Sequence, residues 1–260
     1  MIKRVKVYRF AENKIKEDED FVADEDPLNV VICSYECNEI VIMRTPGNDR
    51  ELIAGFLYTE GLIKGVDDIL EIRELGESSY YVRVNGREKE DEGYSSNSSS
   101  RLINSSCGFC GKNYLSKDVF KVNNWEKVKV NTILELPKKL FESQKVFKIT
   151  GGVHGASLFD MSGEHIYSAE DVGRHNAVDK VIGHLVLNRM IPTNGILQVS
   201  GRLGFEIVYK ASTVGIPIII GISAPSSLAI EYAKVSGITL IGFARESRIN
   251  IYTHPERIEL

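Results

Sequence analysis

Two of the four cysteines in this chain stand close together, in the segment Cys107-Gly108-Phe109-Cys110-Gly111. The thiolate form of cysteine is both the nucleophile and the metal ligand, so this pair carries the strongest chemical signal in the sequence. A glycine follows each cysteine, which frees the backbone and exposes the sulfurs. Residues 95–106 are rich in serine and asparagine, have little apolar surface to bury, and are predicted to be mobile. The pattern indicates a reactive pair that travels between two places.

The spacing of the pair alone leaves other chemistries open. Cys33 and Cys37 form a second pair, and zinc could bind all four cysteines if a tight hairpin at residues 34–36 brought this pair together. The chain would then be a zinc-stabilised, nucleotide-binding protein without sulfur transfer. A dithiol oxidoreductase fits poorly. The cysteine pair of such an enzyme follows a strand and opens a helix, whereas here a serine-rich segment precedes the pair and glycine follows it. A zinc deaminase needs H-x-E before P-C-x-x-C, whereas here Ala156 follows His154 at the glutamate position. We therefore predict no metal site.

Polar turns follow the predicted strands in the second half of the chain. The strands are expected at residues 146–149, 195–199, 217–220 and 239–243, and the turns at 150–155, 200–204, 223–227 and 244–248. Ligands of open α/β sheets bind outside the carboxyl ends of the strands. Glycines and helix N-termini suit phosphate, and Arg202, Arg245 and Arg248 add fork-shaped donors. Each turn alone is also explained by helix capping or tight turning, so the prediction of a phosphate-bearing ligand rests on all four together.

The segment 170–176 is predicted to open a long helix. Capping explains Asp171 and Glu170, which suit a helix N-terminus. It does not explain the succession Arg174-His175-Asn176. His175 is a candidate acid, base or charge partner near neutral pH, and His154, after two glycines, is similarly placed. The other three histidines are interpreted as structural or surface residues.

Composition bounds the protein class. The chain has 260 residues, 43% hydrophobic and 26% charged, and a net charge of −4, which predicts no general affinity for nucleic acid. No apolar run has the length of a membrane helix, and nothing at the N-terminus has the pattern of a signal peptide. We expect a cytoplasmic protein without membrane contact, whose four thiols are reduced and available for chemistry.

The periodicity of the sequence predicts an α/β fold in two regions. Residues 1–130 are expected to form a smaller α+β region that carries the Cys107 and Cys110 loop, and residues 131–260 an α/β cofactor-binding core with a mostly parallel or mixed sheet. Strands are predicted in the first region at 3–10, 28–33, 39–43 and 80–84, with a solvated acidic loop at 12–26 and a helix at 49–62 after Asn48 as N-cap. Further helices are predicted at 132–143, 174–190, 205–214 and 226–235.

Several motifs of the chain, taken in their order along the sequence, resemble those of one known family, the formate dehydrogenase accessory sulfurtransferases. The resemblance covers nearly the whole chain. Its motifs are Thr45-Pro46-Gly47 with residues 51–61, Ser106 to Gly111, Thr150 to His154, residues 170–180, Ser200-Gly201-Arg202, residues 205–208 and Ser223-Ala224-Pro225. Several motifs in order are far more specific than a C-x-x-C pair alone.

The resemblance implies a sulfurtransferase that takes persulfide sulfur from a cysteine desulfurase. It implies delivery to a molybdenum (or tungsten) bis(guanine dinucleotide) cofactor destined for formate dehydrogenase, a cytidine-deaminase-like α/β/α core, and a homodimer. Cys107 corresponds to the persulfide carrier, and Cys110 is expected to assist it. The cofactor site maps to Phe243, Ala244, Arg245, Glu246, Ser247 and Arg248, with walls from Gly151, Gly152, His154, Arg174, His175, Ser200, Gly201, Arg202 and Ser223.

Overall fold

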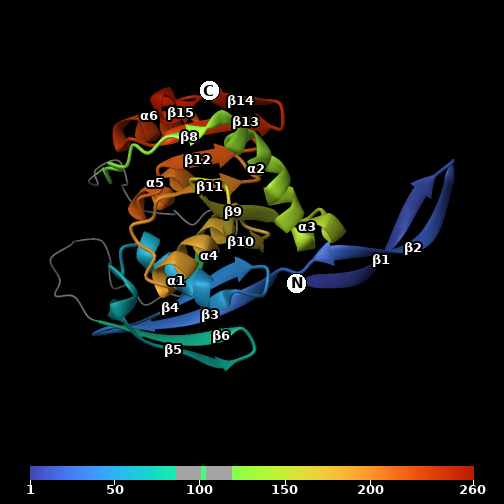
Figure 1. The fold of residues 1–260 in the computed structure, drawn as a ribbon. Coiled ribbons are helices and arrows are strands. Elements are labelled where there is room, and N and C mark those ends of the chain that lie inside the picture. The colour runs from blue at the N-terminus through green and yellow to red at the C-terminus, as the bar shows by residue number, and fades with distance from the viewer. Residues whose placement is uncertain (86–100, 104–118) are drawn as a thin grey trace.

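The computed structural model describes residues 1–85, 101–103 and 119–260. The cysteine pair 107/110 and most of the serine-rich segment lie outside these residues. Within the described residues, an α/β fold is built on two main sheets, as Figure 1 shows. The α/β class predicted from the sequence is therefore confirmed, while the cytidine-deaminase likeness stays a prediction.

The larger sheet has six strands in the order β10-β9-β11-β12-β13-β14. It is mixed, because β11, β12 and β13 run parallel whereas β9 and β10 are antiparallel to their neighbours. The strands are β9 (His154–Asp160), β10 (His165–Asp171), β11 (Gly195–Val199), β12 (Ile218–Gly221), β13 (Thr239–Arg245) and β14 (Arg248–Ile251). The strands predicted at 195–199, 217–220 and 239–243 are thus present.

Alternating side chains of this sheet pack on two faces. Leu158, Leu197, Ile219 and Leu240 form one register row that belongs to a cluster with α4 (Arg174–Leu187), α5 (Phe205–Thr213) and α6 (Ser227–Ser236). The opposite face carries Phe159, Ile196 and Ile218, which cluster with Ile133 and Leu136 of α2 (Val130–Ser143). Strands that are buried on both faces explain the nearly continuous apolar run at 216–222. The result is a helix–sheet–helix sandwich.

The smaller sheet has five strands in the order β5-β6-β3-β4-β7. Helix α1 (Asp49–Thr59) packs on it through Leu52, Phe56 and Leu57. The strands are β3 (Asp26–Cys33), β4 (Cys37–Arg44), β5 (Ile69–Gly76), β6 (Ser79–Val84) and β7 (Arg101–Ile103). One buried cluster joins this layer to α4 and the larger sheet, so the two predicted regions share a core. Their division after residue 130 stays a prediction.

The prediction of a solvated acidic loop at 12–26 is wrong. Residues Lys14–Ala23 form strand β2, which pairs with β1 (Ile2–Ala11) in a hairpin that projects from the body in Figure 1. The acidic run of β2 lies opposite the basic run of β1, and Lys6 with Glu17 and Arg9 with Asp18 form ion pairs. Opposite charges on paired strands favour the sheet, so the acidic segment is stabilised as a strand rather than as a loop.

The strand predicted at 146–149 is also wrong, because this segment is the short helix α3 (Lys145–Thr150). The Glu170 carboxylate accepts hydrogen bonds from the backbone N–H groups of Val146 and Phe147, each at 2.8 Å. Glu170 itself is the penultimate residue of strand β10 and does not open α4, whose N-cap is Gly173. A carboxylate from another element therefore fixes a helix where the local sequence favours a strand.

The remaining elements are short. Strands β8 (Val128–Lys129) and β15 (Ile258–Glu259) pair in parallel, and short 3-10 helices lie at Val66–Asp68 and Pro255–Arg257. Asn48 stands at the N-cap of α1 as predicted, but its side chain does not cap the helix and donates instead to the Tyr167 hydroxyl at 2.8 Å.

Candidate functional site

The predicted polar turns meet at one edge of the larger sheet, which we call the carboxyl edge. The parallel strands β11, β12 and β13 end there. Because β9 is antiparallel to β11, its first residues lie at the same edge, and His154 pairs with Asp171 at the end of β10. The turn at 150–155 therefore reaches this edge from the start of a strand, and not from the end of one as predicted.

Four site residues form a first cluster at this edge. His154 Nδ1 and Ser200 Oγ are 3.3 Å apart, and the backbone N–H of Gly155 donates to Ser200 Oγ at 3.0 Å. A Cβ atom added to Gly201 would lie 3.3 Å from His154 Nδ1 and 3.6 Å from Arg174 Cβ. His154, Ser200, Gly201 and Arg174 are thus direct neighbours.

A second cluster forms around the end of β13. The backbone N–H of Phe243 donates to the Ser223 carbonyl at 3.2 Å, and Arg245 donates through Nη1 to the Ile222 carbonyl at 2.8 Å. Phe243 has a φ of 51°, in the left-handed region that a bulky residue rarely occupies, and its side chain is partly exposed. Strained conformations of this kind gather at functional sites. Ala244 is fully buried in the core cluster that also contains Ile218 and Ile220, so the structure does not expose this predicted site residue to a ligand.

The two clusters are joined by the turns between them. The backbone N–H of Leu203 donates to the Ala224 carbonyl, which links the turn after β11 to the turn after β12. Arg202 is exposed in the first of these turns, and Glu246, Ser247 and Arg248 are exposed where β13 turns into β14. At the other end, Gly151 ends α3 in the left-handed region, and Gly152 lies against Ala23 at the base of the hairpin.

A buried charge network, which the sequence analysis missed, holds the start of α4. Lys180 and Asp171 form an ion pair at 2.8 Å with both side chains fully buried. The second Asp171 oxygen accepts from the Gly173 N–H and from the Asn176 amide. The Lys180 ammonium also donates to the Thr45 carbonyl. The available signal was a charged pair, Asp179-Lys180, inside the otherwise apolar run of the predicted helix.

His175 is the most unusual titratable group of the site. Its ring is buried, and neither ring nitrogen has a hydrogen-bond partner among the described residues. Burial, together with the nearby charges of Arg174 and Lys210, lowers the pKa of His175 to about 3. Burial also lowers the pKa of His154, with Arg174 adding to the effect. Both imidazoles are therefore neutral at pH 7.

The neutral state of His175 predicts a pH dependence of folding. Between the folded-state pKa of about 3 and the ordinary value of 6.5, the unfolded chain binds a proton that the native chain does not bind. The free energy of unfolding should therefore fall as the pH drops through this window, by up to about 1.4 kcal/mol per pH unit from this group. Urea denaturation at several pH values measures it. His175→Gln should flatten the slope, and an unchanged slope in this variant would contradict the assignment.

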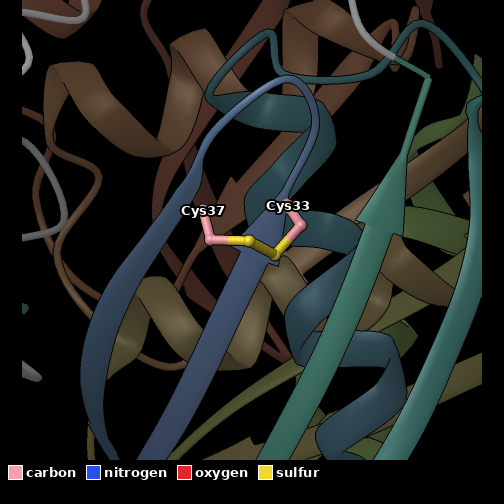
Figure 2. Close-up of a disulfide and its surroundings, with 2 residues drawn as sticks. All are labelled: Cys33 and Cys37. Carbon is pink, nitrogen blue, oxygen red and sulfur yellow. A yellow bond between two sulfur atoms is a disulfide. The ribbon is translucent and has the colours of Figure 1, made fainter.

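The pair Cys33 and Cys37 forms a disulfide between the ends of β3 and β4, drawn in Figure 2. The hairpin that the zinc alternative required is present, yet the two sulfurs bond to each other and are lost as thiolate ligands. The expectation of four available thiols is wrong for this pair, and the four-cysteine zinc site does not fit. Residues 1–85 and 119–260 contain no group of His, Cys, Asp and Glu side chains able to hold a metal ion.

None of the helices in the described part of the chain combines the length and the apolar character of a membrane span. Cys107 and Cys110 lie outside the described residues, so their position relative to the carboxyl edge stays a prediction. The site residues assigned to the carboxyl edge are predictions as well, although the fold brings them to one place.

The sequence is similar to known proteins over its full length. The family model of the FdhD/NarQ family matches residues 23–259. "Sulfur carrier protein FdhD" of Sulfurisphaera tokodaii is 50% identical over 99% of both chains, and the protein of the same name from Sulfolobus acidocaldarius is 49% identical over 100% of this chain and 99% of the relative. A crystal structure from Desulfotalea psychrophila, provisionally identified there as a formate dehydrogenase accessory protein, has a TM-score of 0.79 at 28% identity and covers 99% of each chain. This chain therefore belongs to the FdhD/NarQ family.

Proposed function

We propose that this chain is a sulfurtransferase that carries sulfur for the maturation of formate dehydrogenase. The observation that carries the proposal is the 50% identity, over 99% of both chains, to a relative named as a sulfur carrier protein. The Cys107 and Cys110 pair supplies a chemical means for that role, since thiolates accept and release sulfane sulfur. The donor in this proposal is a cysteine desulfurase in the cytoplasm, and the carrier works as a homodimer.

The transfer begins at Cys107. Its thiolate attacks the terminal sulfur of a persulfide on the donor, the sulfur–sulfur bond of the donor breaks, and the donor cysteine leaves as a thiolate. Cys107 then holds the sulfur as a persulfide. Cys110 assists by exchange or by tuning the pKa of its neighbour. The disulfide between Cys33 and Cys37 leaves these two cysteines without a part in the reaction.

The client in this proposal is a molybdenum or tungsten bis(guanine dinucleotide) cofactor, bound as a substrate at the carboxyl edge. Phosphate groups suit this edge because helix N-termini and arginines converge on it. The exposed ring of Phe243 offers a surface against which a planar base can stack. Soft metals accept sulfur ligands, so a metal held here is a chemically suitable destination.

Mass spectrometry of the protein after incubation with a cysteine desulfurase and cysteine tests the proposal. We expect the mass of one added sulfur atom on a peptide containing Cys107, removed by a reducing agent. Cys107→Ser should abolish the adduct, and Cys110→Ala should reduce it less. The same variants are then tested for maturation of formate dehydrogenase. A carrier role for Cys107 fails if Cys107→Ser matures the enzyme as well as the parent chain does.

A further inference from the structure

The hairpin of β1 and β2, which we call the arm, has two unpaired edges. Among the described residues its strands pair only with each other, through a tight turn at Glu12 and Asn13, which both have positive φ. Figure 1 shows that the arm leaves the body at its base and extends away from it. A two-stranded hairpin alone is marginally stable in water, and an unpaired edge accepts a further strand. The arm is therefore suited to pairing with another strand.

The outer edge of β2 is hydrogen-bonded by its own side chains. In an antiparallel pair, alternate residues bond to the neighbouring strand and the residues between them point outward. The backbone N–H groups of Glu19 and Phe21 donate to the carboxylates of the preceding residues, Asp18 and Asp20, at 2.8 and 2.9 Å. These bonds indicate that the odd-numbered residues of β2 direct their backbone groups outward. A second strand can take over these groups and release both aspartates.

The charges along β2 follow an order that complements a reversed copy of the same strand. The strand begins with Lys14 and Lys16 and continues with four acidic residues at 17–20. The ion pairs of the arm join basic residues of β1 to acidic residues of β2, and no described carboxylate forms an ion pair with Lys14 or Lys16. A strand that is basic in its first part and acidic in its second attracts an antiparallel copy of itself.

We propose that β2 pairs antiparallel with β2 of a second copy of this chain, so that two arms form one four-stranded sheet. Outward residues must oppose outward residues, which restricts the register to steps of two. A twofold axis at Glu17 places Lys14 opposite Asp20 and Lys16 opposite Asp18 of the second copy, so the released aspartates meet the unpaired lysines. An axis at Asp18 would lose the ion pair of Lys14 and place Asp18 against its own copy.

The same register brings exposed apolar side chains together. Ile15 and Phe21 lie on one face of β2 and are 70% and 48% exposed. With the axis at Glu17, Ile15 is diagonal to Phe21 of the second copy, a separation that an aromatic side chain spans. Glu17 faces its own copy, but Lys6 already neutralises each carboxylate. The inference names the surface through which the homodimer of the proposed function assembles, and it rests on that function for the homodimer alone.

Oxidative cross-linking of the full chain at the twofold axis tests the register. In a parent with Cys107→Ser and Cys110→Ser, Glu17→Cys should give a covalent dimer, because residues opposite each other in a sheet lie within reach of a disulfide. Tyr8→Cys is the matched control. Tyr8 pairs with Glu17 on the same face of the arm, but the two copies of Tyr8 would be about 14 Å apart, three strand spacings. Equal cross-linking of the two variants, or none in Glu17→Cys, would overturn the register.

A charge exchange tests the interface without relying on the loss of one variant. Lys14→Glu with Lys16→Glu, and separately Asp18→Lys with Asp20→Lys, should each raise the dimer dissociation constant by about tenfold or more, because like charges then oppose each other. An equimolar mixture of the two should recover the dimer, as measured by sedimentation velocity. Charge variants that dimerise like the parent, or a mixture that stays monomeric, would overturn the arm interface. A monomeric parent would overturn the homodimer too, and persulfide formation on Cys107 is measured separately.

Discussion

Replacing Gly183 by alanine is expected to destabilise the protein by about 3 kcal/mol or more. Gly183 of α4 and Gly55 of α1 face each other where the two helices cross. A Cβ atom on Gly183 would overlap the backbone carbonyl oxygen of Glu51 and lie 2.8 Å from the backbone nitrogen of Gly55. Neither atom belongs to a flexible side chain, so the helices must separate to accept the methyl group. Separation would open the core that joins the two sheets.

Urea denaturation measures this loss, and Gly65→Ala is its control. Gly65 has an extended backbone, and an added Cβ would have no heavy atom within 4 Å, so its replacement should change stability little. Gly55→Ala should resemble Gly183→Ala, because its Cβ would overlap the backbone carbonyl of Asp179. A loss below about 1 kcal/mol in both variants would mean that the crossing is looser than the structure has it.

The crossing matters for the site because α4 carries Arg174 and His175 at its start. Their positions depend on how closely α4 lies against α1 and on the buried network around Asp171. A variant that separates the helices should therefore lose affinity for the proposed client at the carboxyl edge as well as stability. Such a loss would be indirect, because Gly183 faces Glu51 and Gly55 of α1 and not the residues of the carboxyl edge.

The sequence predicted those elements whose burial follows a simple period. The strands β11, β12 and β13 and the helices α4, α5 and α6 were found within a few residues, because an apolar run or a helical stripe is written in the local sequence. The α/β class followed from their alternation. The predictions that were wrong concern elements that depend on residues distant in the chain. Helix α3 needs the carboxylate of Glu170, and strand β2 needs the basic residues of β1.

The same distinction applies to the site. Glycine- and arginine-rich turns predicted the residues at the carboxyl edge, since turn chemistry is local. The route by which the 150–155 turn reaches that edge was not predictable without the antiparallel register of β9. The disulfide between Cys33 and Cys37 required the register of β3 and β4, in which these two residues are paired. Local sequence thus indicated which residues gather at the carboxyl edge, whereas long-range pairing decided how they meet.

Replacing Lys210 by methionine is expected to cost about 3–5 kcal/mol, because it leaves a buried carboxylate without its counter-charge. The Lys210 ammonium donates to both oxygens of Asp179 and to the Thr59 hydroxyl, each at 2.8 Å. The Lys210 side chain is fully buried and that of Asp179 is nearly so. This cluster ties α5 to α4 and α1 beside the Gly55–Gly183 crossing. Burial already raises the pKa of Asp179, against the effect of Lys210, so the lone carboxyl would take up a proton.

The double variant Lys210→Met with Asp179→Leu distinguishes two contributions to the free energy of unfolding. One is the cost of a buried charge without its partner, and the other is the net contribution of the ion pair. Hydrophobic replacement of both partners removes two desolvation penalties, so the double variant should recover most of the stability that Lys210→Met loses. The single variant should also lose less stability at low pH than at neutral pH, since its Asp179 is then neutral at smaller cost. Urea denaturation at two pH values measures both effects. If the double variant were as unstable as Lys210→Met, the three helices would depend on the ion pair itself, and the geometry of α4 at the carboxyl edge would depend on it too.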